Sequence, residues 1–182
     1  MSKRALVTID IQNDYFPGGK WTLDGMEAAA DNAARLLAAA RSAGDTIVHV
    51  HHEFASADAP FFAPGTPGAA IHQKALPLSG ETQVLKHTVN AFQNTNLKDI
   101  LEAAGAEELL ICGAMSHMCI DAAVRAAKDF GFTCTVAQDA CATRELEFNG
   151  KTIPADQVHA AYMSALGFAY ASTPTTDEVL GG

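Results

Sequence analysis

Asp10, Lys86 and Cys119 each stand at or just beyond the carboxyl end of a short apolar run. Each residue alone has an ordinary structural explanation as a turn cap, a solvated cation or a packed thiol. Together a thiol, a carboxylate and an ammonium can perform nucleophilic acyl transfer, because the thiol attacks, the carboxylate carries its proton and the cation steadies negative charge. We therefore interpret the three residues as a candidate catalytic triad.

The position of Cys119 favours it as the nucleophile. A helix is expected over 118–130, so this thiol would lie at a helix N-terminus, where the helix dipole and a nearby Lys86 lower a thiol's pKa. Cys112 and Cys134 lie inside apolar runs, where a cysteine usually packs as a small hydrophobe. Cys141 is expected in a loop near the same edge, and the sequence leaves its role open.

The elements that must position these residues alternate between short apolar runs and longer helix-like stretches, which is typical of a parallel α/β sheet. In such a sheet, ligands bind outside the carboxyl ends of the strands. We predict one domain over residues 1–182, with a proline-rich surface excursion over 53–80. Strands are expected at 5–9, 46–51, 82–86, 108–112, 132–137 and 168–171, and helices at 26–43, 96–104, 118–130 and 155–166.

Composition excludes several classes of protein. A net charge of −9 over 182 residues argues against a nucleic-acid partner, which usually needs a basic face. No apolar run approaches the roughly 20 residues that cross a membrane. The four cysteines have no CxxC spacing, so reduced thiols and a cytoplasmic location are expected.

Four segments together resemble the isochorismatase-like cysteine hydrolase family, which includes nicotinamidases and carbamoylsarcosine amidohydrolase. They occur in the family's order and run from the first expected strand to nearly the last. These are Asp10-Ile11-Gln12-Asn13-Asp14-Tyr15-Phe16, the lysine segment from Lys86 to Phe92, the nucleophile segment Gly113-Ala114-Met115-Ser116-His117-Met118-Cys119-Ile120, and Asp139-Ala140.

The resemblance implies a three-layer α/β/α, Rossmann-like fold with a six-stranded parallel sheet. It assigns the triad roles to Asp10, Lys86 and Cys119. It further implies a cis peptide bond between Ala114 and Met115, with the Met115 and Cys119 amides forming an oxyanion hole. Substrate contacts are expected from Tyr15, Phe92 and Gln12.

The predicted activity is hydrolysis of a C–N bond in a small amide, lactam or ureido compound through an acyl-cysteine intermediate. One alternative is an isochorismate-type vinyl ether hydrolase, in which Cys119 would be dispensable. Another is a non-catalytic α/β binding module, although Asp10 in place of a Gly-rich loop disfavours phosphate binding. The sequence does not identify the substrate.

Histidines near the second expected strand raise the question of a metal. Nicotinamidases of the family carry an Asp-x-His pair there, and this sequence has no aspartate at that position. His49 and His51 lie largely within the strand, and His72 is remote in sequence. We predict no metal and no cofactor.

The aromatic residues of segment 53–80 bear on assembly. Phe54, Phe61 and Phe62 are expected to border the pocket or to leave an apolar patch exposed on a monomer, and such patches usually mark an interface or a binding groove. We therefore expect a homo-oligomer, a dimer or larger, in which this segment contacts a partner subunit.

Overall fold

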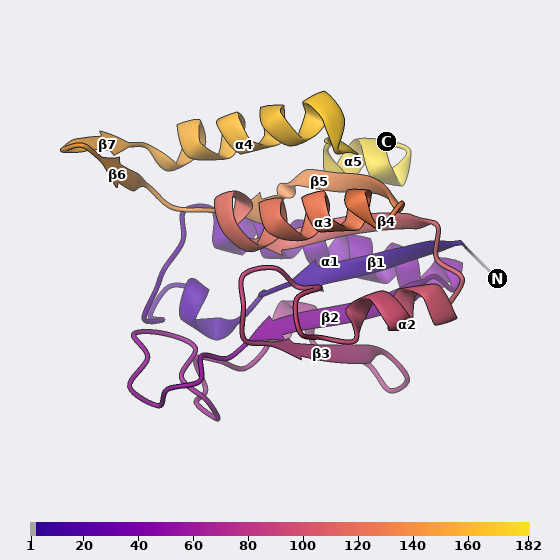
Figure 1. Ribbon diagram of the computed structural model, residues 1–182, viewed down its shortest axis with the longest axis horizontal. Coiled ribbons are helices and arrows are strands. Elements are labelled where there is room, and N and C mark those ends of the chain that lie inside the picture. The colour runs from indigo at the N-terminus through magenta and orange to yellow at the C-terminus, as the bar shows by residue number, and fades with distance from the viewer. Residues whose placement is uncertain (1–2) are drawn as a thin grey trace.

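The computed structural model describes residues 3–182 and contains a six-stranded parallel sheet in the order β3-β2-β1-β4-β5-β8 (Figure 1). This confirms the predicted fold class. The strands are β1 (Arg4–Ile9), β2 (Thr46–His52), β3 (Thr82–Lys86), β4 (Glu108–Ala114), β5 (Thr133–Ala142) and β8 (Ala171–Ser172).

Helices cover both faces of the sheet. One face carries α1 (Met26–Ala43) and the short α5 (Thr176–Leu180), which pack on each other. The other face carries α2 (Leu97–Ala103), α3 (Asp121–Asp129) and α4 (Ala155–Ala169). Within residues 3–182, none of these helices is both long and apolar enough to span a bilayer.

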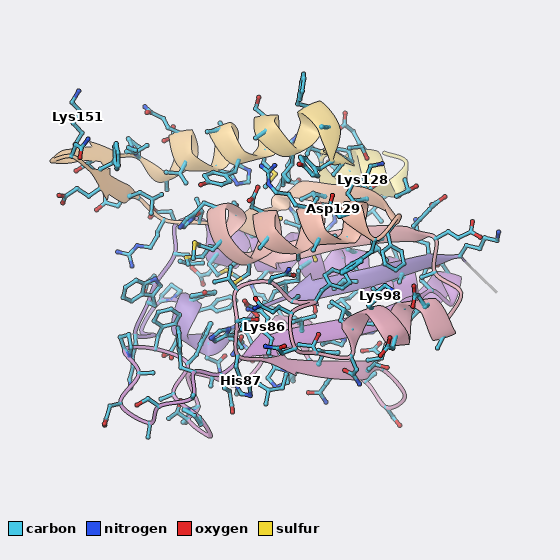
Figure 2. All side chains as sticks on the ribbon, in the orientation of Figure 1. Lys86, His87, Lys98, Lys128, Asp129 and Lys151 are labelled. Atoms are coloured by element: carbon cyan, nitrogen blue, oxygen red, sulfur yellow. The ribbon has the colours of Figure 1, made fainter. Side chains whose placement is uncertain are left out.

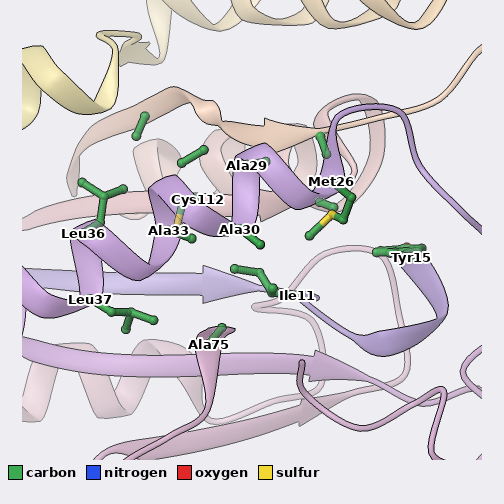
Figure 3. Close-up of a cluster of buried hydrophobic side chains, with 14 of the residues drawn as sticks. Ile11, Tyr15, Met26, Ala29, Ala30, Ala33, Leu36, Leu37, Ala75 and Cys112 are labelled. Atoms are coloured by element: carbon green, nitrogen blue, oxygen red, sulfur yellow. The ribbon is translucent and has the colours of Figure 1, made fainter. Parts of the chain in front are cut away.

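The sheet separates two apolar cores. The first lies under α1, where Leu36, Leu37 and Met26 meet Ile11 and the buried thiol of Cys112 (Figure 3). The second lies under α2 and α3, and it includes Cys119. Burial of such residues is the main favourable contribution to folding, so both faces fix the strand register.

The strand order places β1 at the point where the chain changes direction across the sheet. β1 pairs with β2 on one side and with β4 on the other, and helices follow on opposite faces. The carboxyl end of β1 is therefore a topological switch point, where open α/β sheets form ligand crevices. Asp10 is the first residue beyond that end.

Two features near the C-terminus differ from the prediction. The expected strand over 168–171 is wrong, because α4 continues to Ala169 and leaves only Ala171–Ser172 to pair with β5. A hairpin of β6 (Leu146–Phe148) and β7 (Lys151–Ile153), which projects beyond the end of α4 in Figure 1, was not predicted. Asn149 and Gly150 both take positive φ, as Asn-Gly hairpin turns do, so a sequence signal existed.

Candidate active site

The structure brings the three residues of the candidate triad together at the carboxyl ends of β1, β3 and β4. Lys86 Nζ lies 2.8 Å from Asp10 Oδ2 and 3.3 Å from Cys119 Sγ. Asp10 and Lys86 are completely buried, and Cys119 is nearly so. Lys86 points inward from the end of β3, near the middle of the molecule (Figure 2). The lysine thus bridges the carboxylate and the thiol.

The backbone at the end of β1 turns sharply to present Asp10. Asp10 has φ of 53°, a left-handed conformation that aspartate tolerates better than most residues, and its N–H donates to Val50 O at 2.9 Å. Gly113 of β4 passes so close that a Cβ there would stand 1.9 Å from Ile9 O. Glycine is therefore required at 113 for β4 to lie against β1 at this point.

Cys119 lies in a π-helical turn, Ser116–Ile120, between β4 and α3. The helix begins at Asp121, so the expected helix start near Met118 is three residues too early. The peptide bond between Ala114 and Met115 is cis, which confirms that expectation. Met115 and Cys119 both border the cavity described below.

The charge state of Cys119 differs from the sequence-based expectation. Burial raises the thiol's pKa, the Asp10 charge raises it further, and Lys86 only partly opposes them. The predicted lowering of the pKa is therefore wrong, and the resting residue is a neutral thiol. Burial disfavours the Lys86 ammonium, but its interactions and hydrogen bonds with Asp10 and Cys119 outweigh burial and raise the pKa of Lys86.

Lys86 has more acceptors than hydrogens. Besides Asp10 and Cys119, its Nζ lies 3.0 Å from His52 Nδ1 and 3.1 Å from Thr88 O. An ammonium has three hydrogens and no acceptor, so these four groups compete for three bonds. The contact to the Cys119 sulfur, at 3.3 Å, is the longest and the easiest to exchange.

A cavity of about 80 Å³ adjoins the triad and is lined mainly by apolar atoms. Tyr15, a predicted substrate contact, lies on its wall. Burial, followed by the charge of Asp10, raises the pKa of the Tyr15 hydroxyl well above its usual value. The full lining is Asp10, Tyr15, His52, Phe54, Phe61, Phe62, Val89, Met115, Met118 and Cys119.

The aromatic residues of segment 53–80 pack within their own chain. Phe61 and Phe62 contact each other and Tyr15, with ring centroids 4.6 to 5.9 Å apart, and Phe54 meets Phe61 edge-on. Phe62 is fully buried, and the other two phenylalanines pack against the core. The expected exposure is therefore wrong for Phe62, whereas Phe54 and Phe61 are half-buried, and all three rings wall the cavity of the monomer.

Two predicted substrate contacts lie elsewhere. Phe92 is outside the cavity lining and packs against Phe130 and Phe132. Gln12 is buried, and its amide donates to His52 O at 2.8 Å and to Ala69 O at 2.6 Å. Gln12 therefore positions the end of β2 and segment 53–80.

Asp14 is a structural residue that the motif contained but the sequence reasoning did not assign. Its buried carboxylate accepts from Phe62 N at 2.7 Å and from Lys20 N at 3.1 Å. A Cβ at Gly68 would stand 2.2 Å from Asp14 Oδ1, so glycine makes room for the carboxylate. Asp14 thereby fastens the aromatic wall to the turn that follows Asp10.

The histidines considered as metal ligands have other surroundings. His49 is hydrogen bonded to Thr8 and Glu81, and His72 stacks on Phe16 at 3.6 Å. His51 borders a separate groove with Glu53. Within residues 3–182, no three His, Cys, Asp or Glu side chains are grouped to hold a metal ion. The absence of a metal stays a prediction.

Comparisons with known proteins show what this chain is similar to. Residues 4–164 match the family model of the isochorismatase domain. A crystal structure from Oleispira antarctica, described as an isochorismatase hydrolase, superposes with a TM-score of 0.95 at 55% identity and covers 98% of this chain and 96% of that one.

Among curated proteins, the isochorismatase family protein YddQ of Bacillus subtilis is 49% identical over 97% of this chain and 98% of its own length. Maleamate amidohydrolase of Pseudomonas putida is 30% identical over 78% of this chain and 73% of its own length.

Proposed function

This chain belongs to the isochorismatase family of hydrolases, and on that basis we propose that it is a cysteine-dependent amidohydrolase. The proposed reaction cleaves a C–N bond in a small amide, lactam or ureido compound through an acyl-cysteine intermediate. One observation carries the proposal: Lys86 lies within 3.3 Å of both Asp10 and Cys119 beside an apolar cavity. A relative named as an amidohydrolase supports the choice of an amide bond.

In the first half of the proposed reaction, the neutral thiol of Cys119 transfers its proton to Asp10 as the sulfur attacks the carbonyl carbon. The carbonyl π electrons move onto oxygen, where the N–H groups of Met115 and Cys119 are the proposed donors. Asp10 then returns the proton to the leaving nitrogen, the C–N bond breaks, and an amine or ammonia departs.

In the second half, a water molecule gives a proton to Asp10 and its oxygen attacks the thioester carbon. The C–S bond breaks, and the sulfur recovers the proton to restore the thiol. Lys86 remains an ammonium throughout and stabilises negative charge on Asp10 at rest and on sulfur when the proton has moved to Asp10. A raised thiol pKa fits this scheme, because the proton stays on sulfur until a carbonyl carbon is in place.

Ammonia release from paired small amides tests the proposal. Suitable pairs are pyruvamide with methacrylamide and nicotinamide with benzamide, with allantoin and hydantoin as ureido and cyclic compounds. We expect turnover of at least one compound, and a loss of about 10³-fold or more in Cys119→Ala. Cys134→Ala is the matched control, because that thiol is buried in β5 outside the cavity. Ammonia release by Cys119→Ala within about tenfold of wild type would contradict covalent catalysis by Cys119.

Two further expectations stay predictions. We propose a homo-oligomer on the behaviour expected from the family resemblance, with no role for Phe62, which is buried in the monomer. Light scattering at assay concentration checks this. The cytoplasmic location likewise rests on the sequence.

A further inference from the structure

His52, the last residue of β2, lies inside the cavity with only 6% of its surface exposed. Neither the sequence reasoning nor the proposed reaction gives it a role. Its neighbour His51 lies on the other face of the strand, beside a groove with Glu53. His52 therefore needs an explanation specific to the cavity.

The contact with Lys86 determines which ring nitrogen of His52 carries a proton. Lys86 Nζ lies 3.0 Å from Nδ1, and an ammonium can only donate. We therefore assign Nδ1 as the acceptor of this contact, and the NMR measurement described below tests the assignment. Burial and the Lys86 charge lower the pKa of His52 to about 4, so the ring is neutral at pH 7. A neutral imidazole with a bare Nδ1 carries its proton on Nε2.

Nε2 is buried and has no hydrogen-bond partner among the described residues. The ring packs edge-on against Phe54 with centroids 4.5 Å apart. The backbone is held from both sides, because His52 N donates to Gln12 Oε1 and Gln12 Nε2 donates to His52 O, each at 2.8 Å. The N–H at Nε2 is thus a fixed donor that lacks an acceptor.

We propose that the Nε2–H of His52 recognises a hydrogen-bond acceptor on the substrate, close to the carbonyl that Cys119 attacks. This deepens the proposed function and rests on it. Lys86 contacts both His52 Nδ1 and Cys119 Sγ, so the donor and the attacking sulfur face the same small space. Because the ring is neutral, it suits an uncharged acceptor on the substrate, such as a second carbonyl oxygen or a ring nitrogen.

Cavity size narrows the substrate class further. A volume of about 80 Å³ is well below the roughly 300–1,000 Å³ of cavities that take drug-sized ligands, so the cavity suits a small molecule. Apart from Tyr15, His52 and the two reacting residues, the lining is apolar. The arrangement suits a small 2-oxo amide or a comparable amide with one nearby acceptor.

Pyruvamide and methacrylamide form a direct test, because they have similar shapes and differ by a C=O in place of a C=CH₂. Methacrylamide would leave the buried Nε2–H unpaired, which costs enough to weaken binding about tenfold or more. In the inactive Cys119→Ala protein, calorimetry should therefore show pyruvamide binding at least tenfold more tightly. Equal affinities, or no binding of either compound, would overturn the inference.

Two substitutions of His52 distinguish the role of Nδ1 from that of Nε2. His52→Asn keeps an oxygen near the Nδ1 position to accept from Lys86 but has no group at Nε2, so the preference for pyruvamide should fall to about one. His52→Gln can place its NH₂ near Nε2 and should retain part of the preference. His51→Asn is the matched control and should behave as wild type. A preference unchanged in His52→Asn contradicts the proposal.

Nitrogen-15 NMR of the histidine side chains gives a readout that needs no substrate. The resting protein at pH 7 should show His52 protonated on Nε2 and bare on Nδ1, and the opposite tautomer or an imidazolium would overturn the inference. Failure of the proposed function would give a different result. In that case pyruvamide would still bind more tightly than methacrylamide and His52 would show this tautomer, but wild type would release no ammonia from any amide tested.

Discussion

Two histidines on β2, three residues apart, lie in opposite environments. His49 is fully buried on the α1 face, where its Nδ1 accepts from Thr8 Oγ1 at 3.1 Å and its Nε2 donates to Glu81 Oε2 at 2.8 Å. His52 is buried at the other face, with Nδ1 bonded to Lys86 and Nε2 unpaired among the described residues. Both ring nitrogens of His49 have hydrogen-bond partners, whereas only one ring nitrogen of His52 has one.

The partner of His49 is itself well bonded. Glu81 accepts from Arg41 Nε at 2.7 Å and from Leu78 N at 2.8 Å. The Arg41 hydrogen bond, with smaller help from Leu78 and His49, outweighs partial burial and lowers the pKa of Glu81 to about 2. This network, Thr8–His49–Glu81–Arg41, ties α1 to β1, β2 and the segment before β3. Buried polar groups that are all paired stabilise a fold, whereas an unpaired one in a cavity is available to a ligand.

The largest expected effects come from removing one charge of the candidate active site, either that of Asp10 or that of Lys86. Asp10→Asn and Lys86→Met should each reduce turnover by orders of magnitude, but they should shift the Cys119 pKa in opposite directions. Loss of the Asp10 charge lowers it, and loss of the Lys86 charge raises it. Iodoacetamide at pH 8 should therefore label Cys119 roughly tenfold faster in Asp10→Asn and more slowly in Lys86→Met than in wild type.

Peptide mapping identifies the labelled thiol, and circular dichroism confirms that both variants fold. If Asp10→Asn slows labelling of Cys119, the charge of Asp10 does not hold the proton on sulfur, and the proposed proton transfer loses its basis.

A substitution in the network around His49 and Glu81 should lower the stability of the protein and leave catalysis unchanged. Glu81→Ala leaves His49 Nε2 and the Arg41 guanidinium without their acceptor, which costs about 1–3 kcal/mol of unfolding free energy. Urea unfolding should show a lower midpoint with an unchanged m-value, while kcat and KM stay within twofold. Glu147→Ala, at an exposed position in β6, is the control. A large fall in kcat in Glu81→Ala would remove the distinction between the two regions.

The smallest expected effect is a pH dependence of the contribution that Glu81 makes to the unfolding free energy. Because folding lowers the Glu81 pKa from 4.5 to about 2, the carboxylate's contribution is complete above about pH 4.5 and disappears as the pH falls through about 2. The difference in unfolding free energy between wild type and Glu81→Gln should therefore narrow from pH 6 to pH 3. A constant difference over this range would mean that the ionised form of Glu81 contributes nothing special.

The residues that end the strands were predictable because parallel strands bring their carboxyl ends to one edge. Asp10 and Lys86 followed from that rule, and the cis bond at Ala114–Met115 followed from the resemblance. His52 was missed because alternation along a strand says which face a residue takes, but not whether its second nitrogen finds a partner.

Cys119 shows a different limit of sequence reasoning. Its place near a helix start suggested a lowered pKa, but burial beside Asp10 reverses the sign. Phe92 and Phe62 show the same limit for packing, because their contacts depend on segments far away in sequence. These effects arise from residues that are close in space but distant in sequence, so no local sequence pattern reveals them.

Mass spectrometry of the enzyme during turnover tests the central claim most directly. Protein quenched in acid with an amide that it hydrolyses should gain the mass of the acyl group, and peptide mapping should place that mass on Cys119 as a hydroxylamine-sensitive thioester. His52→Asn should still form the adduct, more slowly, and Cys119→Ala should form none. Efficient turnover with no acyl adduct under any quench, or an adduct on another residue, would contradict the account.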